Sequence, residues 1–358
     1  MAAAAASGYQ VTALDAFSDA DTQRMAHASY SVEYANGQFD AADFERVLNR
    51  LDVGDVTGLV YGSGFEAAPA LLDRAARHLR LIGNTPRVLA SLKHPRKFFM
   101  LLDELKIPHP EVGFQSPGKV RGWVYKQGGG SGGTHVRKAL PSGGIAPEAG
   151  CYFQRIVPGV PVSLLFAADG SQAKAIGFNL QWLSATPAMP YRYGGAVSHA
   201  RLPDTIKQRL LQAAQQLTGA VGLRGLNSID AMMDGDQLWV LEVNPRFSAT
   251  FDLYQSATCN LCELHLRACD GNITDWPQIT RQAKAHQIIY ASHDVTAPGT
   301  TAWPEWVADM PVPASNVAVG SPLCTVLATA DNVDVAQALV SGRAKEIEAM
   351  IENYRIDF

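Results

Sequence analysis

QLWVLEVNPR, residues Gln237–Arg246, is the stretch that decides the fold. Its apolar first half predicts a buried strand, and the alternation of side chains along a strand puts Glu242 and Asn244 on the same face. Pro245 ends the strand because it cannot donate a hydrogen bond to a neighbouring strand. Arg246 follows at once. The stretch therefore delivers a carboxylate, a carboxamide and a fixed cation to one place.

A second strand precedes this one in the sequence. Asn227–Met233 (NSIDAMM) predicts a strand, and Asp234-Gly235 is a signal for a tight hairpin turn between the two strands. Asp230 then lies on the neighbouring strand and can face the same pocket as Glu242 and Asn244. One Asp, one Glu and one amide oxygen suit Mg²⁺, which takes oxygen ligands. The alternative is a strand that simply ends in polar residues at the edge of a sheet.

A glycine-rich loop separates two further predicted strands. Arg121–Lys138 reads RGWVYKQGGGSGGTHVRK, with Lys126 near the end of the first strand and the second strand resuming at Thr134. The glycines between them allow positive φ angles, so successive N–H groups can form a nest for phosphates, and Lys126 adds a point charge. A flexible hairpin tip is the alternative. The P-loop pattern is excluded, because no Gly-Lys-Ser/Thr leads into a helix.

The overall composition is that of a globular enzyme-sized chain. It has 358 residues, room for two or three domains, with 47% hydrophobic and 18% charged residues. A net charge of −4 without basic runs argues against nucleic acid as a partner. No stretch is long and apolar enough for a membrane, and Met1–Ala6 lacks the basic start of a signal peptide. Five cysteines, an odd number, favour a reducing cytoplasm over a disulfide framework.

The first third of the chain alternates short strands with helices, which predicts a parallel sheet flanked by helices. The predicted strands are Tyr9–Ala16 and Gly58–Tyr61, and the predicted helices are Ala41–Leu51 and Ala67–Leu79. Met1–Ser7 resembles the tail of a helix that stops at Gly8, and the strand expected before that helix is absent. Either the native start lies upstream, or the domain lacks its usual first strand.

The remainder is predicted to be richer in strands. Residues 113–270 contain mostly strands, with a helix at Pro203–Leu217, and residues 275–358 form a smaller α+β region. This region is expected to contain strands at Ala285–Ala291 and Pro322–Ala328 and a helix at Val333–Tyr354.

One cysteine cluster has spacings like those of a zinc site: Cys259, Cys262, His265 and Cys269. The intervening leucines and the absence of Gly or Pro predict one continuous helix instead. Ligands on a single helix form a stripe that cannot surround a metal alone. The cluster is therefore interpreted as the buried face of a helix.

Lys126 before the glycine loop, Asp230, and Glu242–Arg246 occur in an order and at separations that resemble the ATP-grasp superfamily. The resemblance covers nearly the whole chain and implies an ATP-grasp fold, an α/β domain followed by α+β parts. The implied domains are an N-terminal α/β domain at 1–112, an ATP-grasp domain at 113–272 with its clamp at about 113–156 and its metal-bearing part at about 157–272, and a C-terminal domain at 273–358.

The resemblance also implies the site and its cofactors, which are ATP and Mg²⁺. Two Mg²⁺ ions are expected, and Mn²⁺ could replace them. The implied metal ligands are Asp230, Glu242 and Asn244, and the implied catalytic residues are Arg246 and Lys126. The implied nucleotide contacts are Lys126, Gly128, Gly129, Gly130, Ser131, Gly132, Gly133, Gln154, Arg155 and Val157, the last two within a backbone hinge that binds adenine.

One position departs from the family pattern. The family has a lysine about eleven residues before the turn that here reads Lys106-Ile107-Pro108, and that position is Pro95. Lys93 and Lys97 flank it, and either is a candidate for the nucleotide phosphates.

Three segments resemble a narrower group, the tyramine–glutamate ligases of methanofuran biosynthesis and related methylofuran proteins: Leu92–Pro110, Pro190–Ala196 and Gly320–Val326. This resemblance implies an ATP-dependent ligase that joins L-glutamate to tyrosine or tyramine through an acyl phosphate. Arg192 and Tyr193 are the candidate substrate residues, with Arg155 in reserve. The alternatives are a ligase for another amino-acid pair, a bicarbonate-activating carboxylase and a non-catalytic ATP-binding protein. A cytoplasmic location is expected, and a homodimer is left open.

Overall fold

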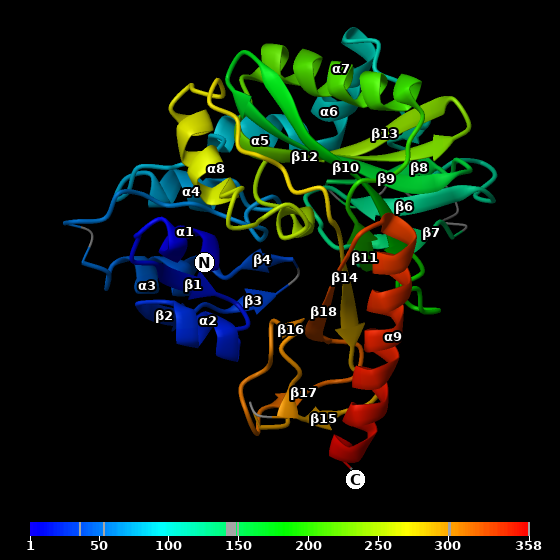
Figure 1. The fold of residues 1–358 in the computed structure, drawn as a ribbon. Helices are drawn as coiled ribbons and strands as arrows, with labels where there is room; N and C mark the ends of the chain where they lie inside the picture. The colour runs from blue at the N-terminus through cyan, green and yellow to red at the C-terminus, as the bar shows by residue number, and fades with distance from the viewer. Residues whose placement is uncertain (36, 53, 141–147, 149, 300–301, 357–358) are drawn as a thin grey trace.

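One antiparallel sheet of eight strands carries QLWVLEVNPR at its edge, in the order β13-β12-β9-β10-β11-β14-β18-β16 (Figure 1). The structure is a computed structural model and describes residues 1–35, 37–52, 54–140, 148, 150–299 and 302–356. The strands of this sheet are β9 (Val160–Asp169), β10 (Ala173–Leu183), β11 (Tyr193–Val197), β12 (Arg224–Asp234), β13 (Gln237–Asn244), β14 (Ala283–Tyr290), β16 (Val307–Ala308) and β18 (Pro322–Ala330).

The hairpin of β12 and β13 forms as the sequence predicts. Gly235 adopts a φ of 56° in the turn, a conformation that favours glycine. Asp230 pairs directly with Glu242, and Ser228 pairs with Asn244. The register shifts next to Asp230, because Ala231 pairs with Val240 and Leu241 is the extra residue of a bulge. Because of this bulge, Glu242 instead of Leu241 lies opposite Asp230, and the two carboxyl groups share one face of the sheet.

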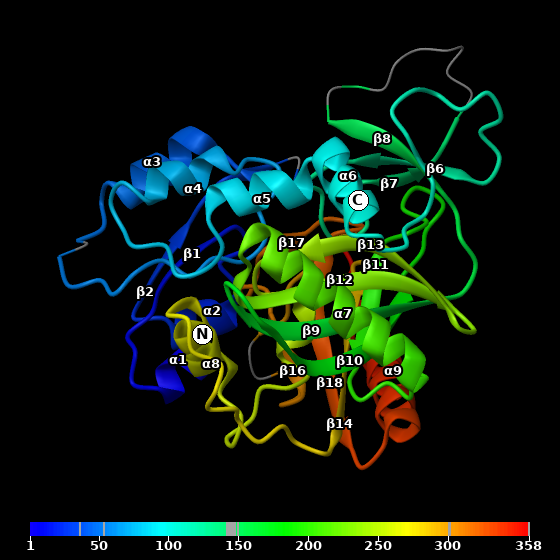
Figure 2. The same ribbon diagram turned by 90° about the horizontal axis from the view of Figure 1, so that it is seen from above.

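The strand β9 shows how the sheet is packed on both faces. Leu164 and Phe166 belong to the core beneath α7 (Asp204–Val221). Leu165 and Ala167 face the opposite way, into the core formed with α8 (Leu261–Cys269). Figure 2 shows α7 lying along the sheet over β9, β10 and β12. The predicted helix at Pro203–Leu217 is therefore confirmed and extends to Val221.

A smaller antiparallel sheet forms the predicted clamp, in the order β5-β8-β6-β7. Its strands are β5 (Val112–Gly113), β6 (Trp123–Gln127), β7 (Val136–Lys138) and β8 (Cys151–Arg155). The glycine loop joins β6 to β7, as expected, although β7 begins two residues after Thr134. Two helices lead into this sheet, α5 (Pro86–Lys93) and α6 (Pro95–Glu104).

The N-terminal part is only partly a parallel sheet. β1 (Thr12–Asp15) pairs in parallel with β2 (Ala28–Ser31), and Leu59 makes an isolated parallel bridge to Leu81. The predicted strand at Gly58–Tyr61 is thus wrong as a regular strand. The other elements here are α1 (Ala2–Ala6), α2 (Ala20–Met25), β3 (Tyr34–Ala35), β4 (Gln38–Phe39), α3 (Ala41–Leu48) and α4 (Ala70–Ala75). Gly8, with a φ of 82°, follows α1 as predicted.

The C-terminal strands continue the large sheet instead of forming one of their own. β14 pairs with β11, and β18 pairs with β14, so one sheet contains strands from both sides of the boundary expected at 272/273. The domain limits expected from the sequence remain predictions. α9 (Val333–Ile351) covers this half of the sheet, and a 3₁₀ turn at Glu352–Tyr354 completes the predicted helix. β15 (Val295–Thr296) and β17 (Asn316–Val317) form a separate pair.

The cysteine-bearing helix differs from the prediction at its start. Asn260 caps α8, so Cys259 lies outside the helix that was predicted to include it. His265 accepts a hydrogen bond from the backbone N–H of Leu226 at 3.0 Å and contacts the carbonyl of Ile82 at 3.0 Å. The histidine therefore links α8 to β12 and to the N-terminal part. The described residues contain no group of three His, Cys, Asp or Glu placed to hold a metal.

None of the helices in the described part of the chain is both long and apolar enough to cross a membrane.

Candidate active site

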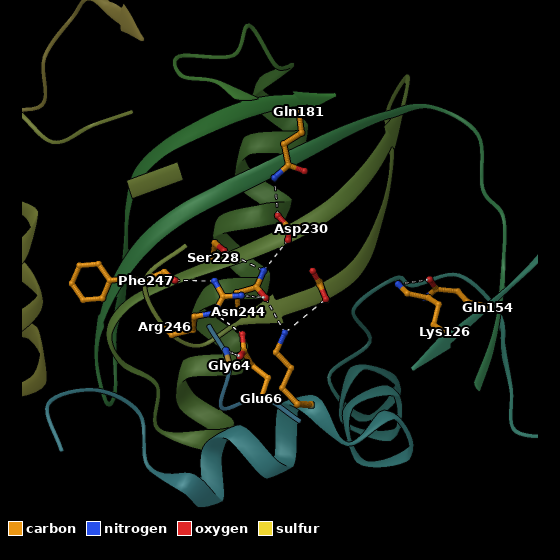
Figure 3. Close-up of polar contacts among 12 residues, drawn as sticks. Gly64, Glu66, Lys126, Gln154, Gln181, Ser228, Asp230, Asn244, Arg246 and Phe247 are labelled. Atoms are coloured by element: carbon orange, nitrogen blue, oxygen red, sulfur yellow. Dashed lines mark hydrogen bonds and ion pairs between the residues drawn. The ribbon is translucent and has the colours of Figure 1, made fainter. Parts of the chain in front are cut away.

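The predicted metal ligands lie together on one face of the sheet. Asp230 and Glu242 are direct cross-strand neighbours, and the Asn244 amide donates to Asp230 Oδ2 at 2.8 Å. Gln181 of β10 donates to the other Asp230 oxygen at 3.0 Å. Ser228 also contacts the Asn244 amide, at 3.5 Å (Figure 3). These bonds fix the Asp230 carboxyl group and the Asn244 side chain beside Glu242.

The two carboxyl groups differ in charge. Burial and the neighbouring charge of Glu242 raise the pKa of Asp230 to about 7. Burial alone would raise the pKa of Glu242 as well, but the ammonium groups of Lys93 and Lys126 hold it at about 2. The Glu242 side chain keeps 32% of its exposure, so water moderates this contrast. The pair is one strongly coupled unit that a cation would stabilise.

Lys93 lies at the centre of the site. Its ammonium group donates to Asn244 Oδ1 at 2.8 Å and lies 3.7 Å from Glu242 Oε2. It reaches these atoms from the last turn of α5, and it is 8% exposed. Lys97, by contrast, is exposed on α6. Of the two candidate lysines, the structure brings only Lys93 to the predicted metal ligands.

Arg246 is held by an ion pair that the sequence analysis did not identify. Its Nε donates to Glu66 Oε1 at 2.5 Å, and both side chains are buried. Its other nitrogens donate to the Phe247 carbonyl at 2.8 Å and to Asn244 Oδ1 at 3.4 Å. Burial by itself would raise the pKa of Glu66, but the positive charges of Arg246 and Lys93 hold the pKa of that carboxyl below its usual value. Glu66 therefore stays ionised and positions the guanidinium beside the ligands.

Lys126 enters the site from the clamp. Its ammonium group donates to Gln154 Oε1 at 3.2 Å. Burial lowers the pKa of Lys126, although the negative charges of Glu242 and Asp230 act in the opposite direction. Gln154 Nε2 is buried and has no partner among the residues that the structure describes. Figure 3 shows this pair facing the cluster around Asp230 and Asn244 from the other side. An unpaired buried donor beside a lysine is consistent with a polar ligand at this place.

The backbone that follows Gln154 is the predicted adenine hinge. The N–H groups of Arg155 and Ile156 donate to the carbonyls of Glu111 and Gly122, both at 2.8 Å. The Arg155 side chain is exposed and lies over the Trp123 ring. Neither these contacts nor the placement of Val157 tests an adenine contact, which remains a prediction.

The glycine loop packs down onto two other parts of the chain. A Cβ on Gly129 would lie 2.7 Å from the backbone of Glu66 and Ala67, and one on Gly133 would overlap the carbonyl of Tyr191. Gly132 accepts a backbone hydrogen bond from Tyr193 at 2.9 Å. Gly128 lies close to Pro95, and Gly130 lies close to His135. The carbonyl of Ser131 accepts a hydrogen bond from the hydroxyl of Thr134. The loop therefore needs glycine for close approach, in addition to freedom in φ.

We predict that this close approach controls nucleotide binding. Gly133→Ala should weaken Mg-ATP binding, and the loss of affinity should be about tenfold larger than for Gly132→Ala. The reason is that overlap with Tyr191 costs about 1–3 kcal/mol. Both glycines have positive φ, of 71° and 63°, but a Cβ on Gly132 meets no atom within 4 Å. Gly132→Ala is thus the control for backbone strain alone. Calorimetric titration measures both affinities, and equal values would show that the packed position of the loop is irrelevant.

A second prediction concerns the motion of the same loop. Amide hydrogen exchange in Gly128–Gly133 should slow when Mg-ATP binds, because active-site lids are drawn from segments of low stability. The exchange of β9, in the core of the sheet, serves as the internal reference. Equal protection of the loop with and without nucleotide would identify it as an ordinary hairpin.

The two predicted substrate residues are tied to the protein itself. Arg192 donates to the Ser184 carbonyl at 3.0 Å, to the Ser184 hydroxyl at 3.2 Å and to the Gly320 carbonyl at 3.2 Å, and its guanidinium lies 3.6 Å from the centre of the Tyr290 ring. The Tyr193 hydroxyl bonds to His286 at 2.7 Å. These contacts indicate that Arg192 holds β11 in place. To bind a substrate carboxylate, Arg192 would have to give up one of these hydrogen bonds to the protein.

Some residues of the site carried no recognisable signal in the sequence. Glu66 reaches Arg246 from the N-terminal third of the chain. The signal available for Glu66 was a glutamate in the glycine-rich segment GSGFE, which is too common a pattern to single out. Another is His135, whose buried Nδ1 has no partner in the described structure and whose pKa burial lowers to about 4.

Comparisons with known proteins support the fold described above. Residues 96–250 match the family model described as an ATP-grasp domain. The chain has the ATP-grasp fold, as the sequence predicts. It is similar to pyruvate carboxylase of Rhizobium etli, with a TM-score of 0.74, 15% identity, and coverage of 98% of this chain but 37% of that one. None of the curated proteins matches this sequence.

Two other solved structures cover more of both chains. The biotin carboxylase domain of 2-oxoglutarate carboxylase from Hydrogenobacter thermophilus has a TM-score of 0.71 and 12% identity, and the match covers 99% of this chain and 87% of that one. N5-carboxyaminoimidazole ribonucleotide synthetase of Thermotoga maritima has a TM-score of 0.67 and 14% identity, with coverage of 97% and 94%. At such identities the likeness shows the fold alone.

Proposed function

We propose that this chain is an ATP-dependent carboxylate–amine ligase that forms an amide through an acyl phosphate. The observation that carries the proposal is the direct pairing of Asp230 with Glu242 beside Asn244. Three buried cations converge on these ligands: Lys93, Lys126 and Arg246. Such a constellation binds a polyphosphate and its metal, and a plain sheet edge would not concentrate buried charge in this way.

The residues fit the two groups that the fold family uses. Two carboxylates and an amide oxygen on one face provide the oxygen ligands that Mg²⁺ takes. Gln154 Nε2 and His135 Nδ1 are buried without a partner in the described part of the chain, so they offer polar contacts for a nucleotide. Hydrogenobacter 2-oxoglutarate carboxylase, of the same fold, was solved with MgADP. We therefore propose Asp230, Glu242 and Asn244 as the metal ligands.

The chemistry follows from these placements. ATP supplies the phosphoryl group that turns a poor acyl donor, a carboxylate, into an acyl phosphate that an amine can attack, with release of phosphate. Lys126 and the N–H groups of the glycine loop would bind the phosphates, and Lys93 would meet them from the sheet side. Arg246, fixed by Glu66, adds positive charge where charge develops during transfer. The packed loop would exclude water, which would otherwise hydrolyse the acyl phosphate.

For the substrates, we propose L-glutamate as the acid and tyrosine or tyramine as the amine. The support is the resemblance of Leu92–Pro110, Pro190–Ala196 and Gly320–Val326 to the tyramine–glutamate ligase group. The segment Pro190–Ala196 includes most of β11, whose half-buried Tyr193 lies near Asp230. An aromatic side chain near the metal ligands suits a phenol-bearing amine.

A second candidate is a carboxylase that activates bicarbonate. Two observations favour it: the likeness to carboxylases over nearly the whole chain, and the bicarbonate bound in the Hydrogenobacter structure. The same metal and phosphate residues would serve, because bicarbonate is also activated by phosphorylation.

Product analysis separates these functions. The enzyme is incubated with Mg-ATP and L-glutamate, with tyrosine, tyramine or no amine, and also with bicarbonate in place of glutamate. The ligase hypothesis predicts release of ADP and phosphate only when acid and amine are both present, with an amide product detected by mass. Turnover that depends on bicarbonate alone would favour the carboxylase. Nucleotide binding without turnover under any condition would contradict both.

A further inference from the structure

Asn84 is a buried residue that the proposed mechanism does not use. It lies directly before Thr85, whose side chain caps the start of α5. The side-chain oxygen of Asn84 accepts a hydrogen bond from the Arg224 N–H at 2.9 Å, and its side-chain nitrogen donates to the Arg224 carbonyl at 3.1 Å. The side-chain amide therefore pairs with Arg224 as the backbone of a neighbouring strand would.

The same side chain also reaches the other strand of the central hairpin. The ladder between β12 and β13 ends at the pair of Ser228 and Asn244, and Pro245 follows without an N–H of its own. Asn84 donates to the Pro245 carbonyl at 2.9 Å. Buried backbone carbonyls are almost always paired, so Asn84 supplies a donor that the sheet does not provide at this point.

Two further buried residues complete this arrangement. Asn227 Oδ1 accepts a hydrogen bond from the Asn84 side chain at 2.8 Å. The Tyr61 hydroxyl donates to the Asn84 carbonyl at 2.6 Å and lies 3.4 Å from the Pro245 carbonyl. We call Tyr61, Asn84, Asn227 and Pro245 the amide junction. It joins the N-terminal part to β12 and to the end of β13, three segments that are far apart in the sequence.

The helix α5 is thereby anchored at both of its ends to QLWVLEVNPR. Asn84, just before its start, bonds to Pro245. Lys93, its last residue, donates to Asn244 Oδ1 at 2.8 Å. A helix of eight residues holds its ends at a separation of about 12 Å. A shift of Asn84 against Pro245 would therefore move Lys93 against Asn244.

We infer that Asn84 is a positioning residue of the proposed active site. It holds the start of α5 against the Pro245 carbonyl, and α5 in turn keeps Lys93 beside Asn244. The inference rests on the proposed function, in which Lys93 meets the nucleotide phosphates. A misplacement of about 1 Å can cost about a hundredfold in rate, so a residue that acts only through Lys93 can still control the site.

The test compares Asn84→Ala with Asn260→Ala, each in the unchanged protein and in a Lys93→Met background. Asn260 is the matched control, because its amide also joins two parts of the chain: it caps α8 and donates to the Ala3 carbonyl at 2.8 Å. None of its partners in the described part of the chain belongs to the proposed site. Calorimetric titration with Mg-ATP measures the affinity, and urea unfolding measures the stability.

Asn84→Ala should weaken Mg-ATP binding about tenfold when Lys93 is present and less than about twofold in Lys93→Met, because residues that act through one another are not additive. Asn260→Ala should lower the stability but leave the affinity unchanged in both backgrounds. A purely structural role for Asn84 would lower stability without this dependence on Lys93.

Tyr61→Phe keeps the inference testable if Asn84→Ala does not fold. This variant removes only the hydroxyl that donates to the Asn84 carbonyl, and it should weaken Mg-ATP binding about threefold, again only with Lys93 in place. Equal losses of affinity in the two backgrounds, or losses no larger than those of Asn260→Ala, would overturn the inference while the proposed function stands. A folded, unchanged protein that does not bind Mg-ATP would overturn the proposed function, and this inference with it.

Discussion

Glu242→Gln is expected to lower turnover at saturating Mg²⁺ and ATP roughly a hundredfold or more while leaving the fold intact. The change keeps the shape of the side chain but removes a charge next to Asp230. Metal stabilisation of developing charge contributes several kcal/mol, and about 1.4 kcal/mol is tenfold in rate. Steady-state release of ADP against Mg²⁺ concentration measures the loss.

The matched control for this prediction is Glu263→Gln, in the first turn of α8. It removes the same charge from a helix that contributes no residue to the proposed site. The control should turn over at nearly the normal rate. Turnover of Glu242→Gln within a few-fold of the unchanged protein would remove Glu242 from the metal site, whatever the control shows.

Glu66→Ala is expected to destabilise the protein by about 3–5 kcal/mol, because it leaves the buried Arg246 without its charge partner. The two side chains are 1% and 8% exposed. Glu66 also accepts the backbone N–H of Gly64 at 2.9 Å, so the deletion breaks the link between the N-terminal part and the end of β13 (Figure 3). The measurement is the shift of the urea unfolding transition followed by tryptophan fluorescence.

A double variant tests whether the loss reflects an unpaired charge. Glu66→Leu combined with Arg246→Met replaces the ion pair by apolar side chains and should lose much less stability than Glu66→Ala alone. Activity should nevertheless be lost in the double variant, because Arg246 is gone. A loss of less than about 1 kcal/mol in Glu66→Ala would mean that water reaches Arg246 and that the pair is not buried in solution.

The pH dependence of stability provides an independent check on the same pair. Since the folded protein holds the pKa of Glu66 below its usual 4.5, the pair stabilises the folded state above that pH. This contribution is lost as the pH falls below about 4.5 towards the folded value. Glu66→Gln should therefore show a weaker loss of stability in this acidic range than the unchanged protein.

The hairpin at the centre of the fold could be predicted because its information is local. Alternation in QLWVLEVNPR and the Asp234-Gly235 turn predict a hairpin that brings Asp230 onto the strand next to Glu242. The bulge at Leu241, which puts Asp230 opposite Glu242, could not be predicted, because the sequence of β12 does not show that β13 carries an extra residue. The glycine loop was likewise evident from composition, although its contacts with Ala67 and Tyr191 were not.

The sequence by itself predicted the main hairpin and the carboxylate–amide pair, because these depend on periodicity and turns within short segments, and its motifs resembled those of the ATP-grasp fold. Only the tertiary structure decided that Glu66 meets Arg246 across 180 residues and that Lys93 meets Asn244 across 151. It also decided that the guanidinium of Arg192 bonds to chain carbonyls. Contacts of this kind depend on which elements pack together, and a charged residue has the same local pattern whether it ends up buried or solvated.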